Sequence, residues 1–101
     1  MNQQAMLKKA RQLQKEMEET QREIAETIFS ETAGGVVTVN VMGTKEIVSV
    51  KIAEDFEIEG KEDLEMLQDM IVAAANNAYQ KIDKTTEEKM AKYSAFFGGM
   101  F

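Results

Sequence analysis

Residues 34–52 read GGVVTVNVMGTKEIVSVKI, and this segment has the clearest β-strand pattern in the chain. Valine and isoleucine recur at every second position on both sides of Gly43 and Thr44, as in half-buried strands. Glycine at the first central position favours a two-residue type II′ turn. The segment is therefore predicted to form a β-hairpin.

The side-chain pattern also predicts the register of this hairpin. A two-residue turn places Val39 opposite Val48 and Val37 opposite Val50, so that one face is apolar and the other mostly polar. A three-residue loop would place valines opposite a serine and a lysine, so the pattern favours an even-length loop. Because an isolated two-stranded sheet is marginally stable in water, we expect the hairpin to pack on helices and on a second copy of the chain.

The segment before the hairpin has the pattern of one long helix. No helix-breaking residue interrupts residues 3–32, and the glycines at 34 and 35 are suited to end a helix there. Apolar and small residues follow the 4-3-4-3-4 spacing of a coiled-coil seam. The seam comprises Met6, Ala10, Leu13, Met17, Thr20 and Ile24.

The segment after the hairpin predicts a second long helix over residues 61–97. The small side chains of Ala74 and Ala78 on its apolar face would let it lie close to the sheet, which we expect it to contact through Val37, Val39, Val48 and Val50. Residues 56–58 are a candidate third strand, and residues 98–101 are expected to form a mobile tail. The expected architecture is a single α+β domain over residues 1–101, with helix 1–32, hairpin 34–52 and helix 61–97.

Composition argues against most catalytic chemistry. The 101 residues include no cysteine, histidine, tryptophan or proline. This removes disulfides, thiolate nucleophiles, imidazole bases and the common zinc ligand sets. We therefore expect no enzymatic activity, cofactor, metal or small-molecule substrate. Residues 70–75 form the longest apolar run, too short to cross a bilayer, and no signal peptide is recognisable, so a cytoplasmic protein without a membrane partner is expected.

Charge is sorted along the chain, although the net charge is -6. Residues 1–15 contain four cations and no acid, namely Lys8, Lys9, Arg11 and Lys15. Acids dominate residues 16–31. At about 100° per residue, Lys8, Arg11 and Lys15 share the side of the helix opposite the seam. The second helix has a broad basic face interrupted by acids, formed by Lys81, Lys84, Lys89 and Lys92. Each group fits either a solvated, locally paired surface or a phosphate-binding surface.

The methionines and phenylalanines fit packing roles better than ligand-binding roles. The eight methionines suit adaptable core and seam contacts. Phe96, Phe97 and Phe101 could stack on nucleobases, but the sequence predicts no sheet on which aromatic and basic residues alternate. Tail packing or contact with a partner is the simpler interpretation of these phenylalanines.

The chain resembles the YbaB/EbfC family of bacterial nucleoid-associated DNA-binding proteins over nearly its whole length. The similar segments are MLKKARQLQKEMEETQREIAE, the hairpin, and LEMLQDMIVAAANNAYQKIDKTTEEKMA. The resemblance implies a homodimer whose sheets associate and whose helices project like the arms of tweezers. It also implies double-stranded DNA as the ligand, little sequence specificity, a location on the nucleoid and an influence on gene expression or nucleoid organisation. Lys8, Lys81 and Lys89 match basic positions of the family, whereas Arg11, Lys15, Lys84 and Lys92 are added by the helical-face argument.

An adaptor that does not contact DNA is the alternative function. Helix, hairpin, helix is also the plan of prefoldin subunits, whose coiled coils project from a sheet. Prefoldin arms are usually longer and have apolar tips, whereas this chain has Lys8, Lys9 and Arg11 at that place. An acidic protein with methionine-rich seams could nevertheless link other proteins, so a chaperone-like or protein-interaction role stays open.

Overall fold

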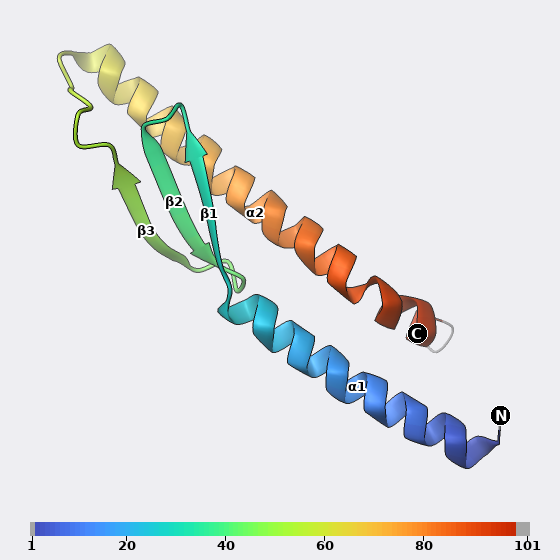
Figure 1. The fold of residues 1–101 in the computed structure, drawn as a ribbon. Coiled ribbons are helices and arrows are strands. Elements are labelled where there is room, and N and C mark those ends of the chain that lie inside the picture. The colour runs from blue at the N-terminus through green and yellow to red at the C-terminus, as the bar shows by residue number, and fades with distance from the viewer. Residues whose placement is uncertain (1, 99–101) are drawn as a thin grey trace.

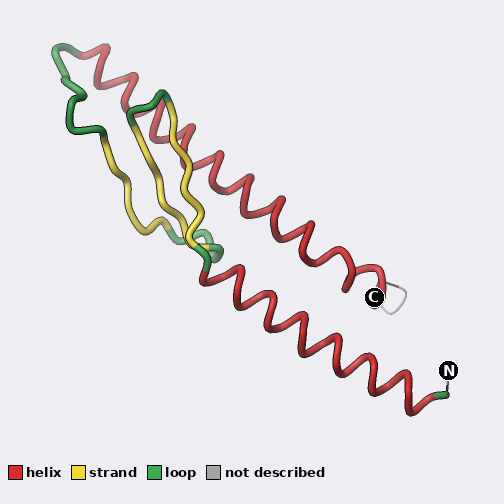
Figure 2. Tube along the Cα trace, in the orientation of Figure 1, coloured by secondary structure: helices red, strands yellow, loops and turns green. Residues whose placement is uncertain are grey.

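The computed structural model describes residues 2–98, and its elements form an elongated α+β molecule (Figure 1). In chain order they are α1 (Gln3–Glu26), β1 (Ile28–Ala33), β2 (Val37–Met42), β3 (Ile47–Ile52) and α2 (Lys61–Phe97). The molecule measures 71 × 20 × 16 Å. The sheet packs on the first part of α2, and α1 leaves the sheet to run antiparallel to the rest of α2 (Figures 1 and 2). The predicted α+β class and the predicted bounds of the second helix are confirmed.

The first helix ends at Glu26, so the prediction that it continues to Thr32 is wrong. Thr27 closes the helix from both its backbone and its side chain. Its N–H donates to the carbonyl of Ile24 at 3.1 Å, and its hydroxyl donates to the carbonyl of Glu23 at 2.6 Å. These bonds satisfy carbonyls that lack partners at a helix C-terminus, and the backbone of Thr27 itself is already extended.

The residues assigned to the end of that helix form a strand instead. Strand β1 (Ile28–Ala33) pairs antiparallel with β2, and the three strands have the order β1-β2-β3. The glycines at 34 and 35 make the turn between β1 and β2, where both have positive φ. The candidate third strand at residues 56–58 is wrong, because these residues lie in a loop that places Phe56 against the core.

The hairpin also differs from the predicted register. Its turn has three residues, since the N–H of Met42 donates to the carbonyl of Glu46 at 2.8 Å. A β-bulge follows, because Val41 pairs with Ile47 while Asn40 pairs with Ser49. The extra turn residue and the bulge together shift the strand by two positions, so Val39 faces Val50 and Val37 faces Ile52. Beyond the bulge the shift is even and keeps Val50 and Ile52 on their predicted face, which is why the alternation could not detect it. Ile47 precedes the bulge and pairs with Val41, so it lies on the other face from the one predicted.

The core lies between the sheet and α2. Val37, Val39 and Val41 of β2 are fully buried, as are Ala74 and Ala78 of α2, whose small side chains let the helix approach the strand closely. The helix covers β1 and β2 and leaves β3 at the open edge of the sheet (Figure 1). The expected contact of α2 with Val48 and Val50 is therefore missing within the chain, and these residues are 54% and 42% exposed.

The turn between β2 and β3 is held between the two helices. The N–H of Gly43 donates to the carbonyl of Thr27 at 3.0 Å, and a Cβ at this position would lie 1.8 Å from the carbonyl oxygen of Ile24. On the other side, the hydroxyl of Tyr79 donates to the carbonyl of Lys45 at 3.3 Å, and the Lys45 ammonium lies 2.9 Å from the carboxylate of Asp83. The turn thus ties the C-terminal end of α1 to the middle of α2.

Two expectations concern the ends of the chain and the membrane. The tail predicted at residues 98–101 falls, from residue 99 onward, outside the described residues. Within residues 2–98 no helix has the length and apolar character needed to span a bilayer.

Candidate nucleic-acid interface

The four cations near the start of α1 are exposed and lie on a stable helical arm. Asn2 caps the arm by accepting a hydrogen bond from the N–H of Ala5 at 2.7 Å. Among residues 2–98, no carboxylate lies within ion-pair distance of Lys8, Lys9, Arg11 or Lys15. These charges are therefore available to an external anion. We refer to the four residues as the basic tip.

The seam of α1 determines where the basic tip points. Leu13 and Met17 are half-buried, Ile24 is buried, and the hydroxyls of Thr20 and Tyr93 of α2 lie 3.3 Å apart. Because the seam faces α2, the opposite side of α1 faces solvent. Lys8 and Arg11 border a common surface groove together with Gln4 and Leu7. The start of α1 also reaches beyond the described end of α2 (Figure 1).

The four lysines of the predicted basic face of α2 lie in two environments. Lys81 lies beside the sheet, where its ammonium is 3.5 Å from the carboxylate of Glu31 on β1. Lys84, Lys89 and Lys92 are exposed farther along the helix, and the Lys92 ammonium lies 4.9 Å from the ring centroid of Tyr93. The predicted basic face is therefore interrupted at Lys81, because a carboxylate from another element already pairs with it.

A group of acids lies at the other end of the molecule. The loop from β3 into α2 and the first turn of the helix contain Glu54, Asp55, Glu57, Glu59, Glu62 and Asp63. In a molecule 71 Å long, this region is several Debye lengths from the start of α1, since charges are screened over about 10 Å at 0.1 M salt. The net charge of -6 consequently says little about the potential at the basic tip.

Sequence reasoning missed two features near these cations. One is the pairing of Glu31 with Lys81, which depends on a strand that the helical pattern concealed. The other is an apolar groove beside the basic tip, lined by Gln3, Met6, Leu7, Ala10 and Phe96. The sequence contained one signal of this groove, because Leu7 is an apolar residue outside the seam.

Within residues 2–98 the structure contains no cluster of three or more acidic side chains placed to hold a metal ion.

The fold and the site define a small α+β protein in which a basic helical arm projects from a helix-covered sheet. The model of the YbaB/EbfC DNA-binding family matches residues 1–97, and the chain belongs to this family.

The chain matches relatives over most or all of their length. A nucleoid-associated protein of Chloroflexus aurantiacus is 37% identical over 102 residues and covers 100% of both chains. A nucleoid-associated protein of Lactococcus lactis subsp. cremoris is 42% identical, over 93% of this chain and 94% of the relative. The fold is similar to the crystal structure of an uncharacterized protein from Helicobacter pylori, with a TM-score of 0.69, 21% identity, and coverage of 92% of this chain and 97% of the other.

Proposed function

We propose that this protein binds the phosphates of double-stranded DNA through the basic tip, with little sequence specificity. The observation that carries the proposal is the set of four exposed cations, Lys8, Lys9, Arg11 and Lys15, for which the described residues provide no carboxylate partner. Membership of a DNA-binding family and the names of the nucleoid-associated relatives support the same ligand. Lys84, Lys89 and Lys92 extend the surface along α2.

Long flexible cations favour phosphate contacts over reading of base pairs. A lysine ammonium is a point charge on a flexible stem, and a phosphate is the same in every nucleotide. Binding should therefore depend steeply on salt and weakly on sequence. If each chain makes about three to four phosphate contacts, the log–log salt slope of a dimer should be roughly -5 to -7.

We further propose that the protein acts as a homodimer through the β3 edge. This strand has unpaired backbone groups along its outer edge and four apolar side chains that are exposed in the single chain: Ile47, Val48, Val50 and Ile52. An exposed apolar edge strand is a template for pairing with another strand, and a second copy would cover it. A dimer would carry two basic arms. Acting on the nucleoid in the cytoplasm, it would influence DNA organisation and gene expression.

The test compares two double variants with the same loss of charge. Lys8→Ala with Arg11→Ala removes two cations from the basic tip, whereas Arg22→Ala with Lys61→Ala removes two exposed cations from elsewhere. Fluorescence anisotropy of a random-sequence duplex should show a salt slope reduced by about two per chain for the tip variant. The control variant should keep the slope of the unmodified protein.

Three outcomes separate the functions. Loss of slope in the tip variant alone supports the proposal. Equal losses in both variants would mean that net charge, rather than the tip, governs binding. No binding by the unmodified protein at low salt would overturn DNA binding and favour the adaptor function.

A further inference from the structure

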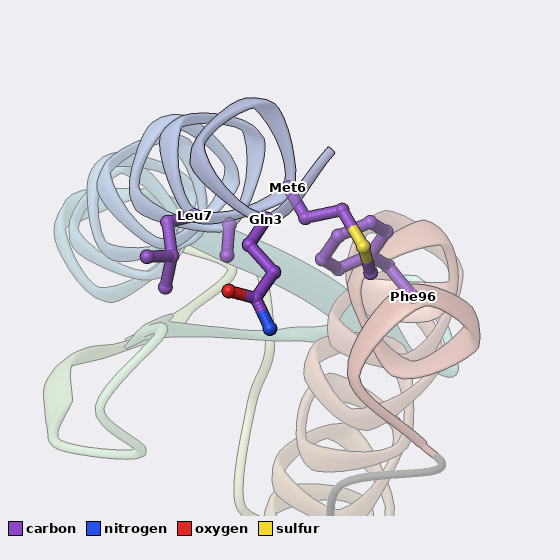
Figure 3. Close-up of a pocket in the computed structure, with 5 residues that line it drawn as sticks. Gln3, Met6, Leu7 and Phe96 are labelled. Atoms are coloured by element: carbon purple, nitrogen blue, oxygen red, sulfur yellow. The ribbon is translucent and has the colours of Figure 1, made fainter. Parts of the chain in front are cut away.

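The groove beside the basic tip lies between the start of α1 and the end of α2. Gln3, Met6, Leu7 and Ala10 come from α1, and Phe96 comes from α2 (Figure 3). Its volume is about 510 Å³, within the usual range for small-molecule sites. In Figure 3 the side chain of Met6 points toward the ring of Phe96, while Gln3 and Leu7 project from the same side of α1. The groove thus has an aromatic wall, an aliphatic wall and an amide at its mouth.

The apolar side chains of the groove are exposed although they lie where two helices meet. Met6 is 50% exposed, Leu7 is 56% exposed and Phe96 is 38% exposed, whereas Phe97 beside it is buried. Leu7 lies about 100° from Met6 around the helix, so α2 cannot cover both residues at once. Within the described residues these side chains therefore remain open to a ligand from outside.

Two cations of the basic tip adjoin the groove on the far side of Leu7. Leu7 also lines the neighbouring groove, together with Gln4, Lys8 and Arg11. The residues lining the two grooves include two cations and two amides, and none of them is acidic. A ligand that matches this surface has a planar apolar face, polar edges and an attached negative charge.

We infer that the groove binds an unstacked nucleobase of DNA. One face of the base would lie on the ring of Phe96, and Met6 and Leu7 would contact the rest of the base. The amide of Gln3 can donate to and accept from a base edge, and Arg11 and Lys8, which lie beyond Leu7 around the helix, can hold the phosphates of the neighbouring nucleotides. A base inside an intact duplex has both faces covered by its neighbours, so the groove selects single strands, bulges and other places where a base is unstacked.

This inference rests on the proposed function, because the basic tip must first bring DNA to the groove. A second copy of the chain would fit the groove less well. The exposed apolar residues that suit self-association lie on β3, and the cations of the neighbouring groove complement the phosphates attached to a base.

The experiment measures the affinity ratio between two probes, an intact duplex and the same duplex with one unpaired bulged base. The unmodified protein should bind the bulged probe more tightly. Phe96→Ala should lower its affinity for the bulged probe about tenfold, the typical effect of losing one base–aromatic stack, and leave the intact probe unaffected. Phe96→Trp should keep the preference, whereas Phe96→Leu, which keeps an apolar side chain without a π-face, should lose it. Val72→Ala is the matched control, because Val72 is another exposed apolar residue of α2 that lies outside the groove.

The outcomes distinguish this inference from the proposed function. Equal affinity of the unmodified protein for both probes overturns the inference and leaves duplex binding intact. A preference that survives Phe96→Ala also overturns it. A changed oligomeric mass of Phe96→Ala in sedimentation would instead identify the groove as an interface between copies. No binding of either probe would mean that the proposed function itself fails.

Discussion

The sheet end and the arm end of this molecule hold their side chains in different ways. At the sheet end, Val37, Val39 and Val41 are fully buried, and the turn at Gly43 touches backbone on the α1 side. At the arm end, the cations are exposed, and Met6 and Leu7 are at least half exposed. Changes at the sheet end should therefore act on folding, whereas changes at the arm end should act on ligand binding.

Gly43→Ala should have the largest effect and should destabilise the sheet end. The new Cβ would lie 1.8 Å from the carbonyl oxygen of Ile24 and 2.5 Å from its carbonyl carbon, both of which are backbone atoms. Either the turn or the end of α1 must move, and the free energy of unfolding should fall by about 3 kcal/mol. Urea unfolding at one fixed protein concentration measures the loss, because dimerisation makes stability concentration-dependent.

Gly60→Ala is the control for this prediction. A Cβ at Gly60 has no neighbour within 4 Å, and Gly60 lies outside the regular elements. Gly60 is the N-cap of α2, where alanine is less favourable than glycine, so the free energy of unfolding should fall by about 1 kcal/mol or less. Equal urea midpoints for the two variants would contradict the tight packing of the β2–β3 turn against α1.

The sequence predicted the arm more accurately than the sheet, for a physical reason. Helix formation depends on residues three and four apart, so the seam and the exposed side of α1 can be read locally. The segment IFSETA continues the helical spacing of α1, yet it becomes β1 because its backbone pairs with β2, and this partner lies outside any local window. The shift in the hairpin register was hidden in the same way. The extra loop residue and the bulge together shift the strand by two positions, so beyond the bulge the alternation of faces is unchanged.

The candidate site was predicted in part. The sorting of charge along the chain predicted the four cations of the basic tip, and the helical face analysis grouped Lys8, Arg11 and Lys15 on one side of the helix. It could not find the groove beside them, because Phe96 comes from the other helix and meets α1 only through the antiparallel packing. It also could not show that Lys81 pairs with Glu31, because that contact requires β1. The sequence pattern could therefore not predict which side chains of different elements contact one another.

Tyr93→Phe should have an intermediate effect, because it acts where the two helices meet. Tyr93 is buried, and its hydroxyl lies 3.3 Å from the hydroxyl of Thr20. Removing one hydroxyl keeps the ring packing and should lower the free energy of unfolding by about 1 kcal/mol. The loss should loosen α1 rather than the sheet, so amide hydrogen exchange should rise in α1 and stay unchanged in β2. Faster exchange throughout β2 would show instead that the arm and the sheet unfold as one unit.

Glu31→Gln should have the smallest effect on stability and a measurable effect on binding. The pair between Glu31 and Lys81 joins partly exposed side chains at 3.5 Å, and such pairs contribute about 1 kcal/mol or less. Removing the carboxylate charge releases Lys81, which the sequence analysis predicted as a DNA-binding residue because it matches a basic position of the family. If Lys81 then contacts phosphate, the salt slope should steepen by up to about 0.9 per chain. The double variant Glu31→Gln with Lys81→Ala should lose this gain in salt slope. If the gain survives in the double variant, it comes from the loss of a negative charge near the DNA. Lys81 would then have only a structural role at the sheet end.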